Sequence, residues 1–163
     1  MITSLAKEQN KETAVGMGQA VVVHEPARLT SILGSCVAVT LYSPKLRLGM
    51  LSHVVLPNGN GNLAAPAKFA DTAVPYMLST MQERGARRSE LIAKVAGGAC
   101  MFGGGRFMDI GESNARVAIA LLEAARVPIV GRDIAGTVGR RICFDLSNGN
   151  LTVESPGHPS RII

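Results

Sequence analysis

The strongest constraint on the fold is a pair of apolar, β-branched runs separated by a short turn. Residues 37–42 and 48–56 have the composition and length of strands. Between them, Ser43, Pro44 and Lys45 favour a turn, because the proline ring fixes φ near the value that a turn requires. The pattern therefore predicts a β-hairpin.

This hairpin would bring a cysteine and a histidine together. With its apex between Pro44 and Lys45, the numbers of paired residues sum to 89, and Cys36 then lies opposite His53. Directly opposed side chains have Cβ atoms roughly 4.5–5.5 Å apart. An imidazole at that distance can take the thiol proton and lower the thiol pKa, and the thiolate attacks carbonyl carbon. A slip of one residue would put the two side chains on opposite faces of the sheet.

The two residues directly before the cysteine suit the same chemistry. Gly34 and Ser35 favour a tight approach in which backbone N–H groups face a developing oxyanion. Each member of the pair also has an ordinary structural interpretation. Taken alone, Cys36 is more often a small buried side chain, and His53 is more often a hydrogen-bonded core residue. Only the two together indicate a nucleophile with its base.

These segments resemble a known family. The sequences LGSCVAV around Cys36 and SHVVLP around His53, with Thr30 six residues before the cysteine, are similar to the CheD family of chemoreceptor glutamine deamidases. The similarity covers about residues 15–153, nearly the whole chain. It implies that Cys36, His53 and Thr30 form the active site, with the Thr30 hydroxyl bonded to the imidazole and fixing its tautomer.

The resemblance also implies an activity and partners. The Cys36 thiolate would attack the side-chain amide of a protein glutamine and release ammonia, and some family members also hydrolyse glutamyl methyl esters. The substrates would be methyl-accepting chemotaxis receptors, and no metal or organic cofactor is needed. An alternative is a regulatory binding module that docks on chemoreceptors or on the phosphatase CheC. Phe69, Ser113 and Ala135 depart from the family pattern, which bears on loop geometry and partner contacts.

The composition bounds the class of protein. A chain of 163 residues, 47% hydrophobic and 18% charged, fits a single domain over residues 1–163 with loose tails at residues 1–13 and 155–163. Three cysteines without C-x-x-C spacing argue against a disulfide framework or a zinc site and fit a reducing cytoplasm. No stretch has the pattern of a signal peptide or the length of a membrane span.

The charge pattern argues against nucleic acid as a partner. The net charge is +5, but the basic residues are scattered and aromatic residues make up only 4% of the chain. A solvated basic surface is the simpler interpretation. Such a surface would also be attracted to an acidic protein partner.

The remaining pattern predicts an α+β fold, a layered α/β sandwich with two main helices packed on mixed, largely antiparallel sheets. The resemblance implies a fold like that of toxin-type cysteine deamidases. One helix would be capped by Asp71 or Thr72 and the other by Asp109 or Ser113. Further strands are expected at residues 20–23, 30–33, 91–96 and 127–130.

A second hairpin is predicted near the end of the chain. Asn148 and Gly149 are typical of a two-residue type I′ turn, so paired residues would have numbers that sum to 297. Cys143 would then lie on the face away from the apolar side chains. Neither Cys143 nor Cys100 has a histidine near it in the sequence, so we interpret both as structural, with Cys100 buried. Residues 132–140 are expected to form a loop.

Overall fold

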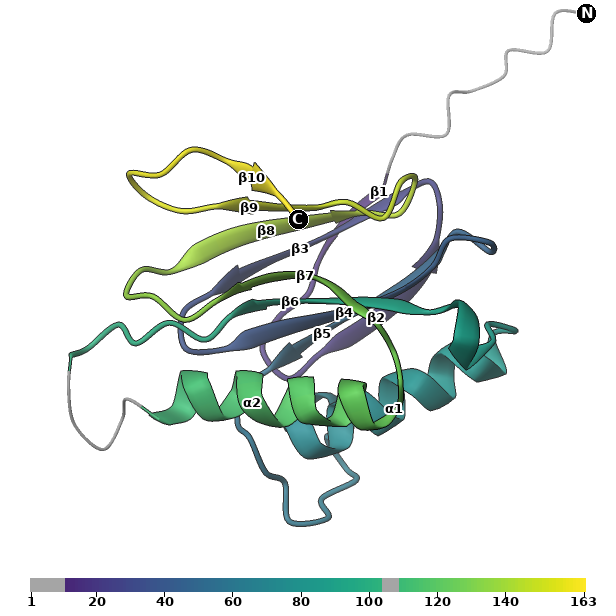
Figure 1. The fold of residues 1–163 in the computed structure, drawn as a ribbon, viewed down its shortest axis with the longest axis horizontal. Helices are drawn as coiled ribbons and strands as arrows, with labels where there is room; N and C mark the ends of the chain where they lie inside the picture. Colours follow the sequence, from purple (N-terminus) through teal and green to yellow (C-terminus); the bar gives the residue numbers. More distant parts are fainter. Residues whose placement is uncertain (1–10, 104–108) are drawn as a thin grey trace, which may run out of the picture.

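The computed structural model describes residues 11–103 and 109–163, and these residues form three layers. Figure 1 shows a first five-stranded sheet, sheet A, above a second five-stranded sheet, sheet B, with the two helices below sheet B. In spatial order, sheet A contains β1 (Lys11–Ala14), β3 (Ala27–Leu33), β8 (Arg140–Asp145), β9 (Leu151–Glu154) and β10 (Arg161–Ile162). Sheet B contains β2 (Ala20–His24), β5 (Leu48–Val54), β4 (Val37–Ser43), β6 (Ile92–Gly97) and β7 (Ile129–Ile134).

The helices and the strand directions confirm the predicted fold class. The helices are α1 (Ala70–Glu83) and α2 (Asp109–Ala124), with short 3₁₀ turns η1 (Pro66–Lys68) and η2 (Arg88–Glu90). The β1–β3 and β6–β7 pairs are parallel, and the other strand pairs are antiparallel. In the described part of the chain, neither helix is long and apolar enough to cross a membrane.

Sheet B is buried on both faces, which explains why its central strands have no polar alternation. Every residue of β4 and β5 is buried. Val37, Val39 and Leu41 pack with the helices in one core, whereas Ala38 and Leu51 belong to a second core between the two sheets. Burial on both faces requires near-continuous apolar runs, and these are the runs that the sequence shows.

Both hairpins were predicted with the wrong register, and by the same amount. In the β4–β5 pair the residue numbers sum to 91, with Ala38 opposite His53, and in the β8–β9 pair they sum to 295. The loop between β4 and β5 has four residues, 44–47, and the loop between β8 and β9 has five, 146–150, where a two-residue apex was expected in each. In the first loop, Arg47 adopts a left-handed φ of 47°, and the Leu46 N–H donates to Ser43 Oγ. The left-handed residue and the hydrogen bond are features of the longer loop.

The helix caps predicted at Asp71, Thr72 and Ser113 are also wrong. Helix α1 begins at Ala70, and its N-cap residue is Phe69, which offers no side-chain hydrogen bond. Asp71 accepts instead from the N–H of Gly59, which fixes the preceding loop. Ser113 cannot cap α2 because it lies inside the helix, which already begins at Asp109.

Three segments expected to be irregular form strands. Lys11–Ala14 pairs in parallel with β3, although residues 1–13 were expected to be a loose tail. Arg161–Ile162 pairs with β9, and β7 extends to Ile134 into the predicted 132–140 loop. Residues 1–10 of the predicted tail lie outside the described residues.

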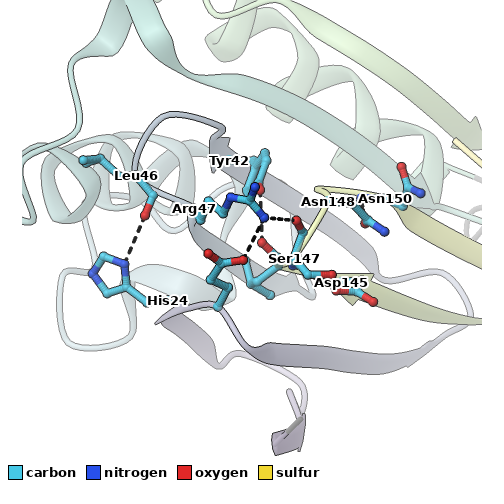
Figure 2. Close-up of polar contacts among 10 residues, drawn as sticks. His24, Tyr42, Leu46, Arg47, Asp145, Ser147, Asn148 and Asn150 are labelled. Carbon is cyan, nitrogen blue, oxygen red and sulfur yellow. Dashed lines mark hydrogen bonds and ion pairs between the residues drawn. The ribbon is translucent and has the colours of Figure 1, made fainter. Parts of the chain in front are cut away.

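A polar cluster ties the two sheets together at the turn end of the β4–β5 hairpin (Figure 2). The Arg47 guanidinium donates to Glu25 at 2.9 Å and to the Ser147 carbonyl at 2.7 Å. The Tyr42 hydroxyl donates to the Leu146 carbonyl at 3.0 Å, and its ring meets Phe144 edge to face at 5.9 Å. The turn of sheet B is thereby fixed to the β8–β9 turn of sheet A.

We expect Tyr42→Phe to lower the free energy of unfolding by about 0.5–1.5 kcal/mol, the typical net contribution of one hydrogen bond. The substitution removes the hydroxyl and keeps the ring against Phe144. Urea denaturation measures the change. Because Tyr42 lies at the opposite end of β4 from Cys36, the reactivity of that thiol should not change. An unchanged stability would mean that the bond to Leu146 contributes nothing in solution.

Candidate active site

A cavity of about 680 Å³ lies at the open end of the β4–β5 hairpin, and both Cys36 and His53 line it. Cys36 is 8% exposed and His53 3%, so the thiol and the imidazole are almost enclosed. Much of the remaining lining is apolar and comes from all three layers, including Met17, Ile32, Met101, Phe102 and Ile110.

The observed register places Cys36 and His53 on the same face but not directly opposite each other. Ala38 is the direct partner of His53, and Cys36 lies two residues before it, just outside β4. Diagonal neighbours of this kind are roughly 7–8 Å apart at Cα. The predicted direct opposition is therefore wrong. The predicted shared face is correct because a shift of two residues preserves the face, whereas a shift of one would reverse it.

The segment before β2 holds His53 at three points. The backbone N–H of His53 donates to the Gln19 carbonyl, and its own carbonyl accepts from the N–H of Gly18, both at 2.9 Å. The ring Nδ1 lies 3.0 Å from the Val15 carbonyl oxygen. A carbonyl can only accept, so Nδ1 carries a proton, and in the neutral ring Nε2 carries the lone pair.

His53 Nε2 is buried and has no hydrogen-bond partner among residues 11–103 and 109–163. Burying a ring nitrogen without a hydrogen-bond partner costs free energy of folding, and a catalytic role is one explanation for such a group. His53 and Cys36 thus line one cavity, and within the described residues no hydrogen bond joins Nε2 to the thiol.

The Val15 carbonyl is itself fixed from sheet A. It accepts from Ser31 Oγ at 2.7 Å, while the Val15 N–H donates to the Thr30 carbonyl at 2.8 Å. Ser31 and the strand pairing of β1 with β3 therefore position the acceptor that orients the imidazole of His53. The sequence gives no sign of this role for Val15, because a backbone carbonyl is common to every residue.

Thr30 does not make the side-chain contact that the family resemblance implied. Its partner on β8 is Cys143, on the outer face of sheet A, whereas Ser31 lies opposite the core residue Ile142. Within the described residues, no hydrogen bond joins the Thr30 hydroxyl to His53. Thr30 is linked to the imidazole only through its backbone carbonyl and Val15. A strict reading of strand alternation would have identified Ser31 as the inward-facing hydroxyl.

The segment that carries Cys36 is held closely by the residues that follow β6. The Gly98 N–H donates to the Cys36 carbonyl at 2.9 Å, and the Ala99 N–H donates to the Gly34 carbonyl at 3.0 Å. Gly97 has a φ of +109°, and a Cβ on it would lie 2.3 Å from the Cys36 carbonyl oxygen. This close approach requires glycine.

The backbone N–H groups beside the cysteine are the candidate donors to an oxyanion. Gly34 and Ser35, the predicted oxyanion candidates, both line the cavity. The N–H groups of Ser35 and Cys36 have no acceptor among the described residues. Consecutive free N–H groups beside a nucleophile are the usual components of an oxyanion hole.

Burial raises the pKa of the Cys36 thiol. The expectation that a neighbouring imidazolium lowers this pKa is therefore not met, since desolvation favours the neutral thiol. Burial therefore keeps the thiol mainly protonated at rest. The thiol proton then has to leave as the sulfur attacks.

A second cysteine lines the same cavity. Cys100, which was expected to be buried elsewhere, is partly exposed and contributes to the cavity wall. Cys143 lies on the outer face of sheet A, as predicted, and does not line the cavity.

A thiol, an imidazole with a free nitrogen and unpaired backbone N–H groups in one cavity form the arrangement that cysteine-dependent hydrolases use. The chain belongs to the CheD family, since the model of that family, described as CheD chemotactic sensory transduction, matches residues 50–155.

Similar proteins carry the same family name. The protein from Desulforamulus reducens named "Probable chemoreceptor glutamine deamidase CheD" is 38% identical, over 94% of this chain and 96% of its own. The protein of that name from Moorella thermoacetica is 37% identical over the same shares. The solved structure of the hypothetical protein YfiH from Bacillus licheniformis superposes with a TM-score of 0.46 at 12% identity, over 72% of this chain and 49% of that one.

We expect Gly97→Ala to move the Cys36 carbonyl and to reduce the reactivity of the thiol. The new Cβ would meet backbone, which cannot yield as a flexible side chain does, so the free energy of unfolding should fall by about 1–3 kcal/mol. The matched control is Gly85→Ala, at a φ of +94° but with nothing within 4 Å of the added carbon. Iodoacetamide labelling of Cys36 should slow in the first variant only. Equal labelling rates in both variants would contradict the close packing at Gly97.

Proposed function

We propose that this protein is a cysteine-dependent protein-glutamine deamidase that acts on methyl-accepting chemotaxis receptors. The observation that carries the proposal is the presence of Cys36 and the free Nε2 of His53 in one cavity. The relatives named as chemoreceptor glutamine deamidases support the choice of substrate, as does membership of the CheD family.

The first half of the reaction forms a thioester. As Cys36 Sγ attacks the glutamine side-chain carbonyl carbon, His53 Nε2 takes the thiol proton, which compensates for the raised pKa of the buried thiol. The carbonyl oxygen becomes an oxyanion and is stabilised by the N–H groups of Ser35 and Cys36. His53 then returns the proton to the departing nitrogen, the C–N bond breaks, and ammonia leaves.

The second half hydrolyses the thioester. His53 removes a proton from water, the hydroxide attacks the same carbonyl carbon, and the Cys36 thiolate leaves and is reprotonated. The products are a glutamate side chain and the original thiol. A glutamyl methyl ester can follow the same steps with methanol as the leaving group, and we include this reaction in the proposal.

The orientation of His53 is essential in both halves. Because Nδ1 donates to the Val15 carbonyl, the imidazolium that forms after proton transfer is stabilised and kept in place. We propose that Thr30, the third residue of the expected active site, contributes through the backbone bond that holds Val15.

A second candidate role is protein docking, including docking on the phosphatase CheC. Large apolar side chains at the cavity rim are exposed, with Ile32 77% and Phe102 93% accessible. Exposed apolar groups beside a cavity favour a protein over a small solute as the ligand. Docking and catalysis can use the same surface, and the Cys36→Ala variant separates them because it should lose the chemistry and keep the binding.

We expect Cys36→Ala and His53→Gln each to reduce deamidation of purified receptor cytoplasmic fragments almost completely. The double variant should be little worse than either single one, since residues that act as a unit are not additive. Peptide mass spectrometry detects each conversion as a gain of about 1 Da, fixed by the replacement of NH₂ by OH. Cys143→Ala is the control and should keep full activity. Deamidation by Cys36→Ala at the wild-type rate would exclude the enzyme and favour the docking role.

The raised pKa of Cys36 gives a pH test. Without His53 as a base, iodoacetamide can react only with free thiolate, and burial makes thiolate scarce below the ordinary cysteine pKa of about 8.5. In His53→Gln we therefore expect Cys36 labelling only at alkaline pH, whereas the wild type should be labelled near neutrality. Identical pH profiles for the two proteins would contradict general-base assistance.

A further inference from the structure

The side chain of Asn114 joins the cysteine segment to the histidine strand. Asn114 lies on α2 and is completely buried. Its Nδ2 donates to the Val55 carbonyl at 3.0 Å and to the Ser35 carbonyl at 3.3 Å. Ser35 directly precedes Cys36, and Val55 is two residues beyond His53.

This bridge begins where the strand pairing ends. The last pair of the β4–β5 ladder is Val37 with Val54, so Cys36 and Val55 lie outside it. The Val55 N–H donates to the Lys68 carbonyl, and β5 thus leaves its neighbour at this point. Between the ends of the two segments, the Asn114 amide takes the place of the missing ladder bonds. The bond to the Ser35 carbonyl lies one residue before Cys36.

The amide oxygen of Asn114 argues against a role in stability alone. Asn114 Oδ1 is buried and has no hydrogen-bond partner within residues 11–103 and 109–163. A buried acceptor without a partner opposes folding. Stability alone would thus favour another residue here, whereas a requirement for two N–H donors at fixed positions explains an amide.

We propose that Asn114 is a positioning residue that sets the geometry between Cys36 Sγ and His53 Nε2. The inference rests on the proposed function, because it assigns the amide to the same thiol–imidazole pair. Without the two donated bonds, the Ser35 carbonyl is released and the Cys36 segment can move away from β5. A displacement of about 1 Å in an active site can reduce the rate roughly 10²-fold.

The test compares Asn114→Ala and Asn114→Asp with the control Ala118→Gly. The aspartate keeps the shape of the side chain and loses both N–H donors. Ala118 is equally buried on α2, one turn further along, and packs in the core between sheet B and the helices. The control therefore loosens the same helix without altering a bond to the site.

We expect both Asn114 variants to lower kcat for receptor-fragment deamidation by about 10–100-fold with little change in KM, since substrate contacts are retained. The pH profile of Cys36 alkylation should shift to higher pH, because the imidazole no longer lies within reach of the thiol. Ala118→Gly should lower the midpoint of thermal unfolding and leave both kcat and the alkylation profile unchanged.

Two results would overturn the inference. One is a wild-type alkylation profile and kcat in a folded Asn114→Asp protein. The other is the same shift in Ala118→Gly, which would show that any loosening of α2 has this effect. If Asn114→Asp does not fold, because its carboxylate is buried against two carbonyl oxygens, the neutral Asn114→Ala decides the question by the same two measurements. Alkylation measures the thiol–imidazole pair without a receptor, so it can succeed where deamidation fails. If labelling of the wild type depends on His53 but no receptor glutamine is deamidated, the proposed function is refuted.

Discussion

The hydrogen bond from His53 Nδ1 to the Val15 carbonyl is the interaction on which the site depends. Its net contribution to stability is only about 0.5–1.5 kcal/mol, but it decides which imidazole nitrogen is free. His53 belongs to sheet B, whereas the acceptor Val15 is fixed by Ser31 and Thr30 of sheet A. The orientation of the His53 imidazole thus requires that the two sheets pack correctly.

The helix layer completes the arrangement. Ile110 of α2 contributes to the cavity wall, Asn114 reaches both segments that carry the reactive residues, and Met17 and Ile32 supply the opposite side. The cavity therefore lies where the ends of all three layers meet. The polar cluster around Arg47, at the far end of the β4–β5 hairpin, ties sheet A to sheet B without touching the cavity. Stability and chemistry are thus supported by different ends of the same strands.

The sequence was sufficient for the fold class, for most of the strands and for placing Cys36 and His53 on one face, but not for the pairing details. Turn residues such as Pro44 and Gly149 mark where a hairpin reverses, yet they do not determine how many residues the loop contains, and the two loops have four and five residues. The face of His53 was predicted correctly because the error was an even number of residues. The contact of the Val15 carbonyl with His53 depends on long-range packing, and the amino-acid sequence does not indicate it. The expected bond from the Thr30 hydroxyl to His53 is absent from the described residues, because a family motif gives a position but not the direction of a side chain.

The most direct test of this account is the tautomer of His53 in solution. Long-range ¹H–¹⁵N correlation spectra of ¹⁵N-labelled protein, recorded where the imidazole is neutral, distinguish the two ring nitrogens by their chemical shifts. We predict a protonated Nδ1 and an unprotonated Nε2, since Val15 can only accept a hydrogen bond. A protonated Nε2, or an averaged signal from both tautomers, would contradict the claim that the Val15 carbonyl orients the imidazole toward Cys36.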